Sequence, residues 1–330
     1  MPPQKGLERR RIMYRIGVDL GGTNIAVGLV NEEYQIVCKK SVPTDAERGG
    51  VAIVADMAAL CLALCREQGI TMADVTSVGI ATPGIADHDT GIVEYANNLP
   101  FKKFPIAALL SEKLGGAKVF IENDANAAAL GEAVAGAARG SKNSVMITLG
   151  TGVGGGIIWD GKVYSGFNYA GGELGHIVIE HGGRPCSCGR RGCWEAYSSA
   201  TALVNMTKDK LEECRASGRE TIMTKYVADA GRVTGRTAFD AMRAGDAAGK
   251  EVVDLYLSYL VTGLVNIVNI FQPEVISLGG GVSNEGQSLI DALLPGIRAE
   301  QYGNGVVPVT EIRIAKLKND AGIIGAAMLG

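Results

Sequence analysis

Residues 14–31, YRIGVDLGGTNIAVGLVN, and residues 144–163, SVMITLGTGVGGGIIWDGKV, share one pattern. In each, two short β-branched apolar runs flank a centre of glycine and threonine. This pattern predicts two strands joined by a turn whose backbone amides are exposed. We therefore predict two hairpins of one design, and the duplication indicates two related domains.

The sequence between and after these hairpins predicts alternating helices and strands. Hydrophobic spacing and turn residues predict helices at 51–68, 125–138 and 246–271, and strands at 75–80, 118–121 and 275–278. Thr82-Pro83-Gly84 forms a turn after one of these strands, and Cys61 and Cys65 are expected in the core. Asn123 and Asp124 therefore stand at a strand end, directly before an alanine-rich helix.

Composition limits the classes of function. A chain of 330 residues, 47% of them hydrophobic, is long enough for about two domains with a core each. A net charge of -3 with 20% charged residues predicts a small-molecule partner and no binding of nucleic acid. No apolar window reaches the roughly 18 uninterrupted residues of a membrane helix, and the basic N-terminal stretch lacks a signal-peptide core. We expect a cytoplasmic protein without membrane contact.

The first hairpin turn favours phosphate. Its glycines, Gly21 and Gly22, allow a close approach to phosphate oxygens, Thr23 adds a hydroxyl, and Asp19 can meet Mg²⁺ or its waters. An ordinary glycine-rich turn remains the alternative.

The second turn, Gly150 to Gly156, matches the spacing G-x-G-x-x-G. A dinucleotide fingerprint must open a helix, whereas Ile157, Ile158 and Trp159 predict a strand. The chain also contains no G-x-x-x-x-G-K-[ST]. Two such turns facing one another across a cleft suit a nucleoside triphosphate held between two domains.

Asn123-Asp124 allows two interpretations. Asp124 can simply cap the helix that follows. It can also accept a hydroxyl proton during phosphoryl transfer, a task that requires position more than a perturbed pKa.

A histidine and three cysteines predict a metal site. His176, Cys186, Cys188 and Cys193 offer one imidazole and three thiolates, a closed tetrahedral set for structural zinc. The seven cysteines, an odd number, also favour metal over disulfides. His88 and His181 are expected on surface loops, although His181 could compete as the ligand. Glu173 and Glu195 flank the metal loop, which would fix their carboxylates for hydrogen bonds to sugar hydroxyls.

These motifs together resemble the ROK sugar kinases, and within them the bacterial glucokinases. DLGGTN at 19–24, ENDANAAALGE at 122–132, GTGVGGG at 150–156, ELGH at 173–176 and CSCGRRGCWE at 186–195 stand in the family's order. The resemblance extends from residue 15 to residue 330, so it covers nearly the whole chain.

The resemblance implies an α/β fold of the actin-like, hexokinase type (ribonuclease H-like), with two domains around a cleft. The small N-terminal domain would span 1–122 together with a returning C-terminal helix at about 318–330. The large domain would span 123–317 and carry the zinc loop. The activity implied is transfer of phosphate from ATP, with Mg²⁺, to the 6-hydroxyl of glucose, in a homo-oligomer of two or four chains.

The family also assigns site residues by similarity. Asp124 would be the catalytic base, and the sugar would be bound by Gly84, Asn98, Asn123, Asp124, Glu173, His176 and Glu195. The nucleotide would be bound by Asp19, Gly21, Gly22, Thr23, Asn24, Thr151, Gly152, Val153, Gly154, Gly279, Gly280 and Gly281. One structural zinc ion would be bound by His176, Cys186, Cys188 and Cys193. His176 would use one ring nitrogen for zinc and the other for the sugar.

Several alternatives stay open at this point. Another hexose, such as N-acetylmannosamine, mannose, fructose or allose, could be the acceptor, and polyphosphate could be the donor. The family also contains sugar-responsive transcriptional repressors, but about fourteen residues before the first strand are too few for a helix-turn-helix unit.

Overall fold

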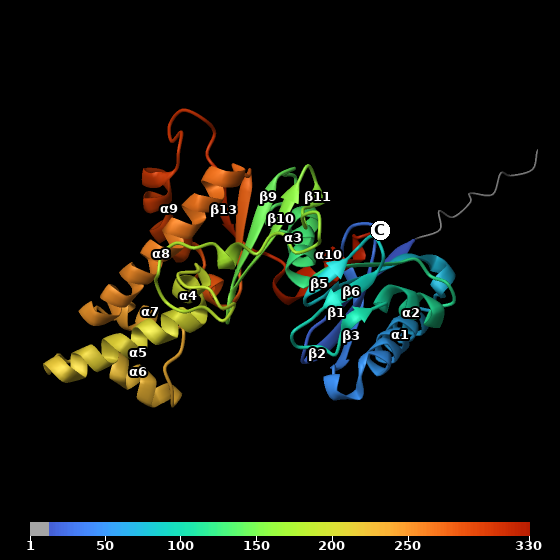
Figure 1. Ribbon diagram of the computed structural model, residues 1–330, viewed down its shortest axis with the longest axis horizontal. Helices are drawn as coiled ribbons and strands as arrows, with labels where there is room; N and C mark the ends of the chain where they lie inside the picture. The colour runs from blue at the N-terminus through green and yellow to red at the C-terminus, as the bar shows by residue number, and fades with distance from the viewer. Residues whose placement is uncertain (1–12) are drawn as a thin grey trace, which may run out of the picture. The chain divides into compact units, whose positions relative to one another are not determined.

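A computed structural model describes residues 13–330 of the chain, which form two compact units (Figure 1). The first unit contains the described residues up to Ala135, together with Gly166–Ala170 and Asn319–Gly330. The second unit contains Gly136–Ser165 and Gly171–Lys318. Most of the N-terminal extension considered above lies outside the described residues.

The first unit is built on a five-stranded sheet with the order β3-β2-β1-β4-β8. Strand β1 is antiparallel to β2 and parallel to β4, β2 is antiparallel to β3, and β4 is parallel to β8. The bounds are β1 (Tyr14–Leu20), β2 (Asn24–Val30), β3 (Ile36–Pro43), β4 (Val75–Thr82) and β8 (Val119–Asn123). A small antiparallel sheet accompanies it, made of β5 (Ile85–Asp87), β6 (Ile92–Tyr95) and β7 (Lys102–Phe104).

The second unit repeats this plan. Its sheet has the order β11-β10-β9-β12-β13, with β9 antiparallel to β10 and parallel to β12, as β1 is to β2 and β4. The bounds are β9 (Ser144–Leu149), β10 (Val153–Trp159), β11 (Lys162–Val163), β12 (Val275–Gly279) and β13 (Glu311–Ile314). The predicted pair of related hairpins, β1–β2 and β9–β10, is therefore confirmed.

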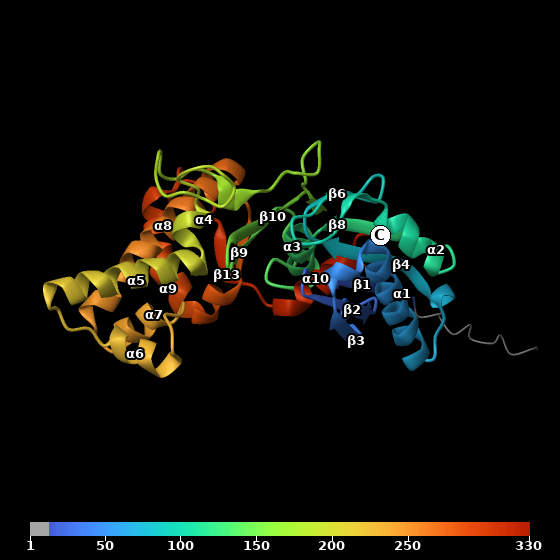
Figure 2. The same ribbon diagram turned by 60° about the horizontal axis from the view of Figure 1, so that its bottom comes forward.

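The alternation of side chains along β1 explains how its sheet is covered. Ile16, Val18 and Leu20 are buried in the core that α1 (Gly50–Glu67) and α2 (Ile106–Lys113) complete. Gly17 and Asp19 point to the other face, as a period of two requires. There they meet α10 (Ala321–Ala327): a Cβ on Gly17 would lie 1.8 Å from the Ile323 carbonyl oxygen. Figures 1 and 2 show α1 and α2 on one side of the sheet and α10 on the other.

The unit boundary differs from the prediction at residue 122. Helix α3 (Asp124–Ala135) stays in the first unit because it packs backbone to backbone against α10. A Cβ on Gly325 would lie 1.6 Å from the Ala127 carbonyl oxygen, and one on Gly131 would lie 2.4 Å from that of Ala321. The helix also ends three residues before the predicted 138, just before Gly136, because glycine is unfavourable in a helix interior.

Helices cover the sheet of the second unit, and Figure 2 shows α5, α7 and α8 packed together. Their bounds are α4 (Glu195–Ser198), α5 (Ala200–Ser217), α6 (Met223–Ala230), α7 (Thr237–Arg243), α8 (Ala247–Phe271) and α9 (Gln287–Glu300). Among residues 13–330, α8 is the one helix long and apolar enough to span a membrane by length and composition. Half of its apolar window is buried within the protein, as in the core helix of a globular domain.

Candidate functional site

Three parallel strand ends gather chemistry-bearing residues in the first unit. The register pairs Asp19 of β1 with Ala81 of β4, and Thr82 of β4 with Asn123 of β8. The carboxyl ends of parallel strands lie at the same edge of a sheet, where open α/β sheets bind their ligands. Asp19, the turn at Gly84 and the Asn123-Asp124 pair therefore share one edge.

The first glycine turn is tight and supported from outside. Gly21 N–H donates to the Asn24 carbonyl oxygen over 2.9 Å, and the Thr44 hydroxyl donates to the Gly21 carbonyl oxygen over 2.6 Å. A Cβ on Gly22 would lie 2.8 Å from the Asn98 side-chain nitrogen, so Asn98 packs directly on the turn. Thr23 ends the turn and Asn24 begins β2, and both residues are exposed.

The helix cap belongs to Asn123 rather than to Asp124. The Asn123 side-chain oxygen accepts hydrogen bonds from the backbone N–H groups of Ala125 and Asn126, over 2.9 and 3.3 Å. Its side-chain nitrogen donates to the Gly84 carbonyl oxygen over 3.0 Å. The Asp124 carboxylate accepts a hydrogen bond from Ala125 N–H over 2.8 Å, so it contacts only the first turn of the helix.

Burial perturbs both carboxyl groups at this edge. Burial, and then the charge of Asp124, raise the pKa of Asp19 to about 6. Burial also raises the pKa of Asp124, although the hydrogen bond from Ala125 N–H opposes the shift. A divalent cation bound beside these two carboxyl groups would favour their ionised forms.

The second glycine turn is anchored to the start of α5. Ala200 N–H donates to the Gly150 carbonyl oxygen over 2.8 Å, and the Thr201 hydroxyl donates to the Thr151 carbonyl oxygen over 2.7 Å. The turn passes directly into strand β10, so the dinucleotide fingerprint is excluded as the sequence predicted.

Glu195 lies against this turn. Its carboxylate accepts a hydrogen bond from Val153 N–H over 3.0 Å and one from the Ser187 hydroxyl over 3.3 Å. A Cβ on Gly152 would lie 2.2 Å from the same carboxylate. Glu173, by contrast, is exposed just before the short 3-10 turn Leu174–His176. The two glutamates predicted to bind the sugar therefore differ in their surroundings: Glu173 is exposed, whereas Glu195 is already hydrogen-bonded to the protein.

Gly279 is the last residue of β12, and Gly280 and Gly281 follow it. Gly280 has a φ of 83° and packs on the end of β9, where a Cβ would lie 2.5 Å from the Leu149 carbonyl oxygen. Glycine is therefore required there. Gly281 lines a cavity of about 520 Å³ with Arg236, Arg243, Asn284 and Glu285. A second cavity of about 390 Å³ begins at Thr151 and runs along α5.

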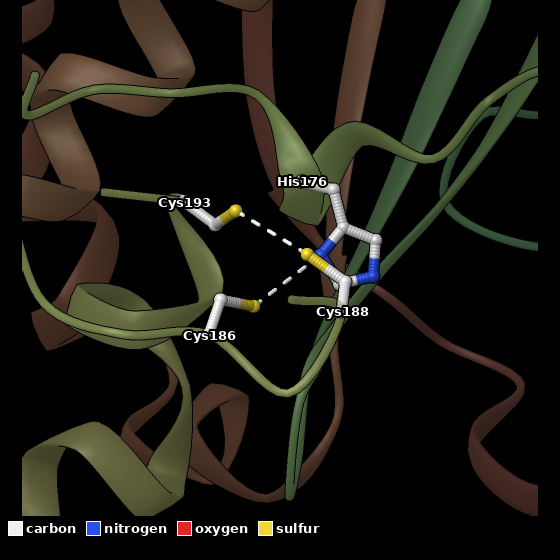
Figure 3. A group of neighbouring side chains, drawn as sticks. All are labelled: His176, Cys186, Cys188 and Cys193. Carbon is white, nitrogen blue, oxygen red and sulfur yellow. Dashed lines mark hydrogen bonds between the residues drawn. The ribbon is translucent and has the colours of Figure 1, made fainter. Parts of the chain in front are cut away.

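The predicted metal ligands converge (Figure 3). The ligand atoms of His176, Cys186, Cys188 and Cys193 all lie within 4.8 Å of one another. The Cys186 sulfur lies 3.6 Å from His176 Nδ1, and the sulfurs of Cys188 and Cys193 lie 3.6 Å apart. A zinc tetrahedron with bonds of about 2.0–2.3 Å has edges of about 3.3–3.8 Å, so these two separations fit zinc. His181 is outside the group, which leaves His176 as the imidazole.

The thiols of Cys188 and Cys193 have different surroundings in the metal loop. The backbone N–H of Arg190 lowers the pKa of Cys188, while burial raises the pKa of Cys193 to about 12. A bound cation would favour the thiolate of both.

The ROK family model matches residues 15–330 of this chain. The chain belongs to the ROK family. A glucokinase of Halalkalibacterium halodurans is 38% identical over 95% of this chain and 94% of its own length. An N-acetyl-D-glucosamine kinase of Aliivibrio salmonicida is 33% identical over 95% of this chain and 98% of its own. The crystal structure of a ROK family glucokinase from Streptomyces griseus, in complex with glucose and AMPPNP, is 33% identical with a TM-score of 0.75, covering 96% and 99% of the two chains.

The ROK neighbours establish the fold as the actin-like, hexokinase type. Two sheets of equal order, each opened by a glycine-turn hairpin, are the elements that this fold requires. The expected fold class is therefore confirmed.

In this ROK chain the sequence analysis missed two side chains next to the catalytic candidate. Glu122 is buried, and its carboxylate contacts Asn123, Asn126 and His88. His88 is exposed as expected, but its Nδ1 lies 3.2 Å from Glu122. A carboxylate within a buried strand, one residue before the Asn-Asp pair, was a signal for Glu122, whereas nothing local indicated its partner 34 residues away.

Proposed function

We propose that this chain is a hexose kinase that transfers the γ-phosphoryl group of ATP to the 6-hydroxyl of glucose. One observation carries the proposal: in a chain 38% identical to a glucokinase, Asp124 presents a half-buried carboxylate at the strand ends, next to Asp19 and the first glycine turn. A carboxylate at this place can serve a hydroxyl acceptor, because phosphoryl transfer depends on position and charge rather than on covalent catalysis.

Asp124 is the general base. Its carboxylate accepts the proton of the sugar's 6-hydroxyl while the sugar's 6-oxygen forms a bond to the γ-phosphorus. The bond between the γ-phosphorus and the oxygen that bridges it to the β-phosphorus breaks at the same time, and ADP leaves. The hydrogen bond from Ala125 N–H holds the carboxylate in one orientation. Its raised pKa makes it a stronger proton acceptor than an ordinary aspartate.

The nucleotide is held by residues of both glycine turns. Gly21, Gly22, Thr23 and Asn24 offer backbone N–H groups to phosphate oxygens, and the turn from Thr151 to Gly154 offers the same kind of groups. Gly279 to Gly281 and the cavity lined by Arg236 and Asn284 accept the nucleoside. Mg²⁺ bound to ATP would neutralise phosphate charge. The Asp19 carboxylate would bind this ion directly or through one of its water ligands.

The sugar is held by Gly84, Asn98, Asn123, Asp124, Glu173, His176 and Glu195. His176 contributes through Nε2, because its Nδ1 faces the Cys186 sulfur. Glu195 can accept a sugar hydroxyl beside Val153 N–H, because an ionised carboxylate has about four acceptor positions. Asn123 retains one amide hydrogen, since its oxygen caps α3 and its nitrogen already donates once.

Zinc is structural in this proposal. His176, Cys186, Cys188 and Cys193 would hold one ion, which would fix the loop that carries Glu195 and orient the ring of His176. Four protein ligands leave no open position for catalysis. We further expect a cytoplasmic homo-oligomer that binds neither nucleic acid nor membrane.

N-acetyl-D-glucosamine is the second candidate acceptor, because a relative named for that sugar is 33% identical over 95% of the chain. A steady-state screen tests both, together with mannose, fructose, N-acetylmannosamine and allose, each with ATP and with polyphosphate. We expect glucose with ATP to have the highest kcat/KM, and the product to be the 6-phosphate by NMR. A tenfold preference for another sugar or donor would overturn that assignment, and turnover of none would overturn the kinase.

A further inference from the structure

Glu122 is a buried carboxylate that the proposed reaction does not use. It is 2% exposed and lies on β8, an edge strand of its sheet, two residues before Asp124. A buried carboxylate is costly unless hydrogen bonds compensate its lost hydration. Its partners therefore explain why it is tolerated there.

Those partners lie on both sides of Asp124 in the chain. One carboxylate oxygen of Glu122 accepts from Asn123 N–H over 2.8 Å and from the Asn126 side-chain nitrogen over 3.0 Å. Asn126 is itself buried in the first turn of α3. Glu122 thus ties the strand end to the helix start, and Asp124 lies between the two tied residues.

His88 completes the set from another segment. Its Nδ1 lies 3.2 Å from the second carboxylate oxygen of Glu122, and its Nε2 lies 3.8 Å from Asp89. The ring of Tyr169 packs edge-on against His88 with centroids 4.8 Å apart, and the Tyr169 hydroxyl donates to Asp89 over 2.6 Å. The imidazole is therefore held at a fixed place while its outer side stays exposed.

We propose that Glu122 and His88 are a positioning pair for Asp124. Glu122 fixes the peptide on either side of the base, and His88 fixes Glu122 by occupying its second oxygen. In this proposal both residues act through their contacts with the protein. A base that must meet one hydroxyl loses rate steeply with displacement, since a shift of about 1 Å can cost about a hundredfold. The inference rests on the proposed role of Asp124.

Steady-state kinetics of Glu122→Ala test whether Glu122 positions Asp124. We expect kcat to fall about ten- to a hundredfold, with the KM for ATP within about twofold because the glycine turns are untouched. Cys61→Ala is the matched control: it removes a buried side chain from α1 in the same unit, away from the strand ends. If Glu122→Ala keeps wild-type kcat, or if Cys61→Ala loses as much at equal melting temperature, the proposal is wrong.

His88 variants test the role of His88, and they remain informative even if Glu122→Ala does not fold. His88→Ala should lower kcat, and His88→Gln, whose amide can donate in place of Nδ1, should restore most of the loss. Glu122→Gln combined with His88→Ala should cost less than the sum of the two, because both act on one contact. Additive losses, or no rescue by glutamine, would remove His88 from the pair.

Amide hydrogen exchange provides a readout without activity. In the wild type, Asn123 N–H is protected by the Glu122 carboxylate. Glu122→Ala should speed its exchange at least about tenfold while the amides of β1 stay protected. Unchanged exchange would overturn the positioning role, whereas wild-type protein that phosphorylates no sugar would overturn the proposed function and leave this measurement valid.

Discussion

Asp124 carries the chemistry of the proposed reaction, so its replacement separates rate from binding. Asp124→Asn keeps the shape and an oxygen that can accept from Ala125 N–H, but it removes the proton acceptor. We expect kcat to fall at least about a hundredfold, with the glucose dissociation constant, measured calorimetrically, within about threefold. Retention of more than a tenth of the wild-type kcat in a folded variant would exclude Asp124 as the base.

The Asp19 carboxylate should lower the stability of the folded protein at neutral pH, while the proposed reaction requires it. Its pKa is about 6 in the folded protein and about 3.8 when unfolded, so the folded state binds the proton more tightly. The group's favourable contribution is present below pH 3.8 and is lost as the pH rises through 6. Without nucleotide, Asp19→Asn should therefore raise the free energy of unfolding at pH 7.5 by up to about 3 kcal/mol. The melting temperature should rise with it.

The same variant should lose most of its ATP-dependent turnover, because the amide cannot meet Mg²⁺ as a carboxylate does. Thermal unfolding of both proteins between pH 4 and 8 checks the prediction. A stability difference that does not shrink below pH 5 would contradict the raised pKa.

At the scale of the element, the metal loop is a single unit whose four ligands come from residues 176–193. Cys188→Ser should lose the zinc, lower the melting temperature and weaken sugar binding through Glu195. Cys214→Ala is the control, since Cys214 is a buried thiol of the same unit outside the metal group. Elemental analysis should find about one zinc per chain in wild type and control; a zinc-free wild type would refute the site.

Helix α10 approaches its sheet closely at glycines, beside the contacts that Ile323 and Ala327 make with Val30. A Cβ on Gly79 would lie 1.8 Å from the Ala326 carbonyl oxygen, and a backbone atom has little room to yield. Gly79→Ala should destabilise the first unit by about 3 kcal/mol or more. Gly235→Ala, where a Cβ meets nothing within 4 Å, is the control for denaturant unfolding. Equal midpoints for the two variants would show that the close approach is not required.

At the scale of the whole molecule, two separate cores predict two cooperative steps. One core lies within the first unit and the other within the second. All seven residues of α10 are buried, although the chain reaches them only after completing the second unit. A chain ending at Lys318 should therefore lose one calorimetric transition and retain the other, together with its zinc. Persistence of both transitions would show that α10 is dispensable.

The sequence alone determined the parts of this protein that depend on local spacing. Alternation with a period of two and glycine-threonine centres predicted both hairpins, and one histidine with three cysteines predicted the metal group. The order of the motifs indicated the family, and the place of Asp124 at a strand end followed from its neighbours. Each of these inferences concerns residues close together in the chain, so short-range geometry was sufficient.

Tertiary structure alone decided which distant residues meet. Glu122 and His88 are 34 residues apart, Glu195 and Val153 are 42 apart, and α3 joins the first unit because α10 packs against it. No periodicity encodes these contacts, since they depend on the path of the whole chain and on where glycine lets two backbones touch. Asp124, the proposed base, was visible in the sequence, whereas the contact between Glu122 and His88 was not.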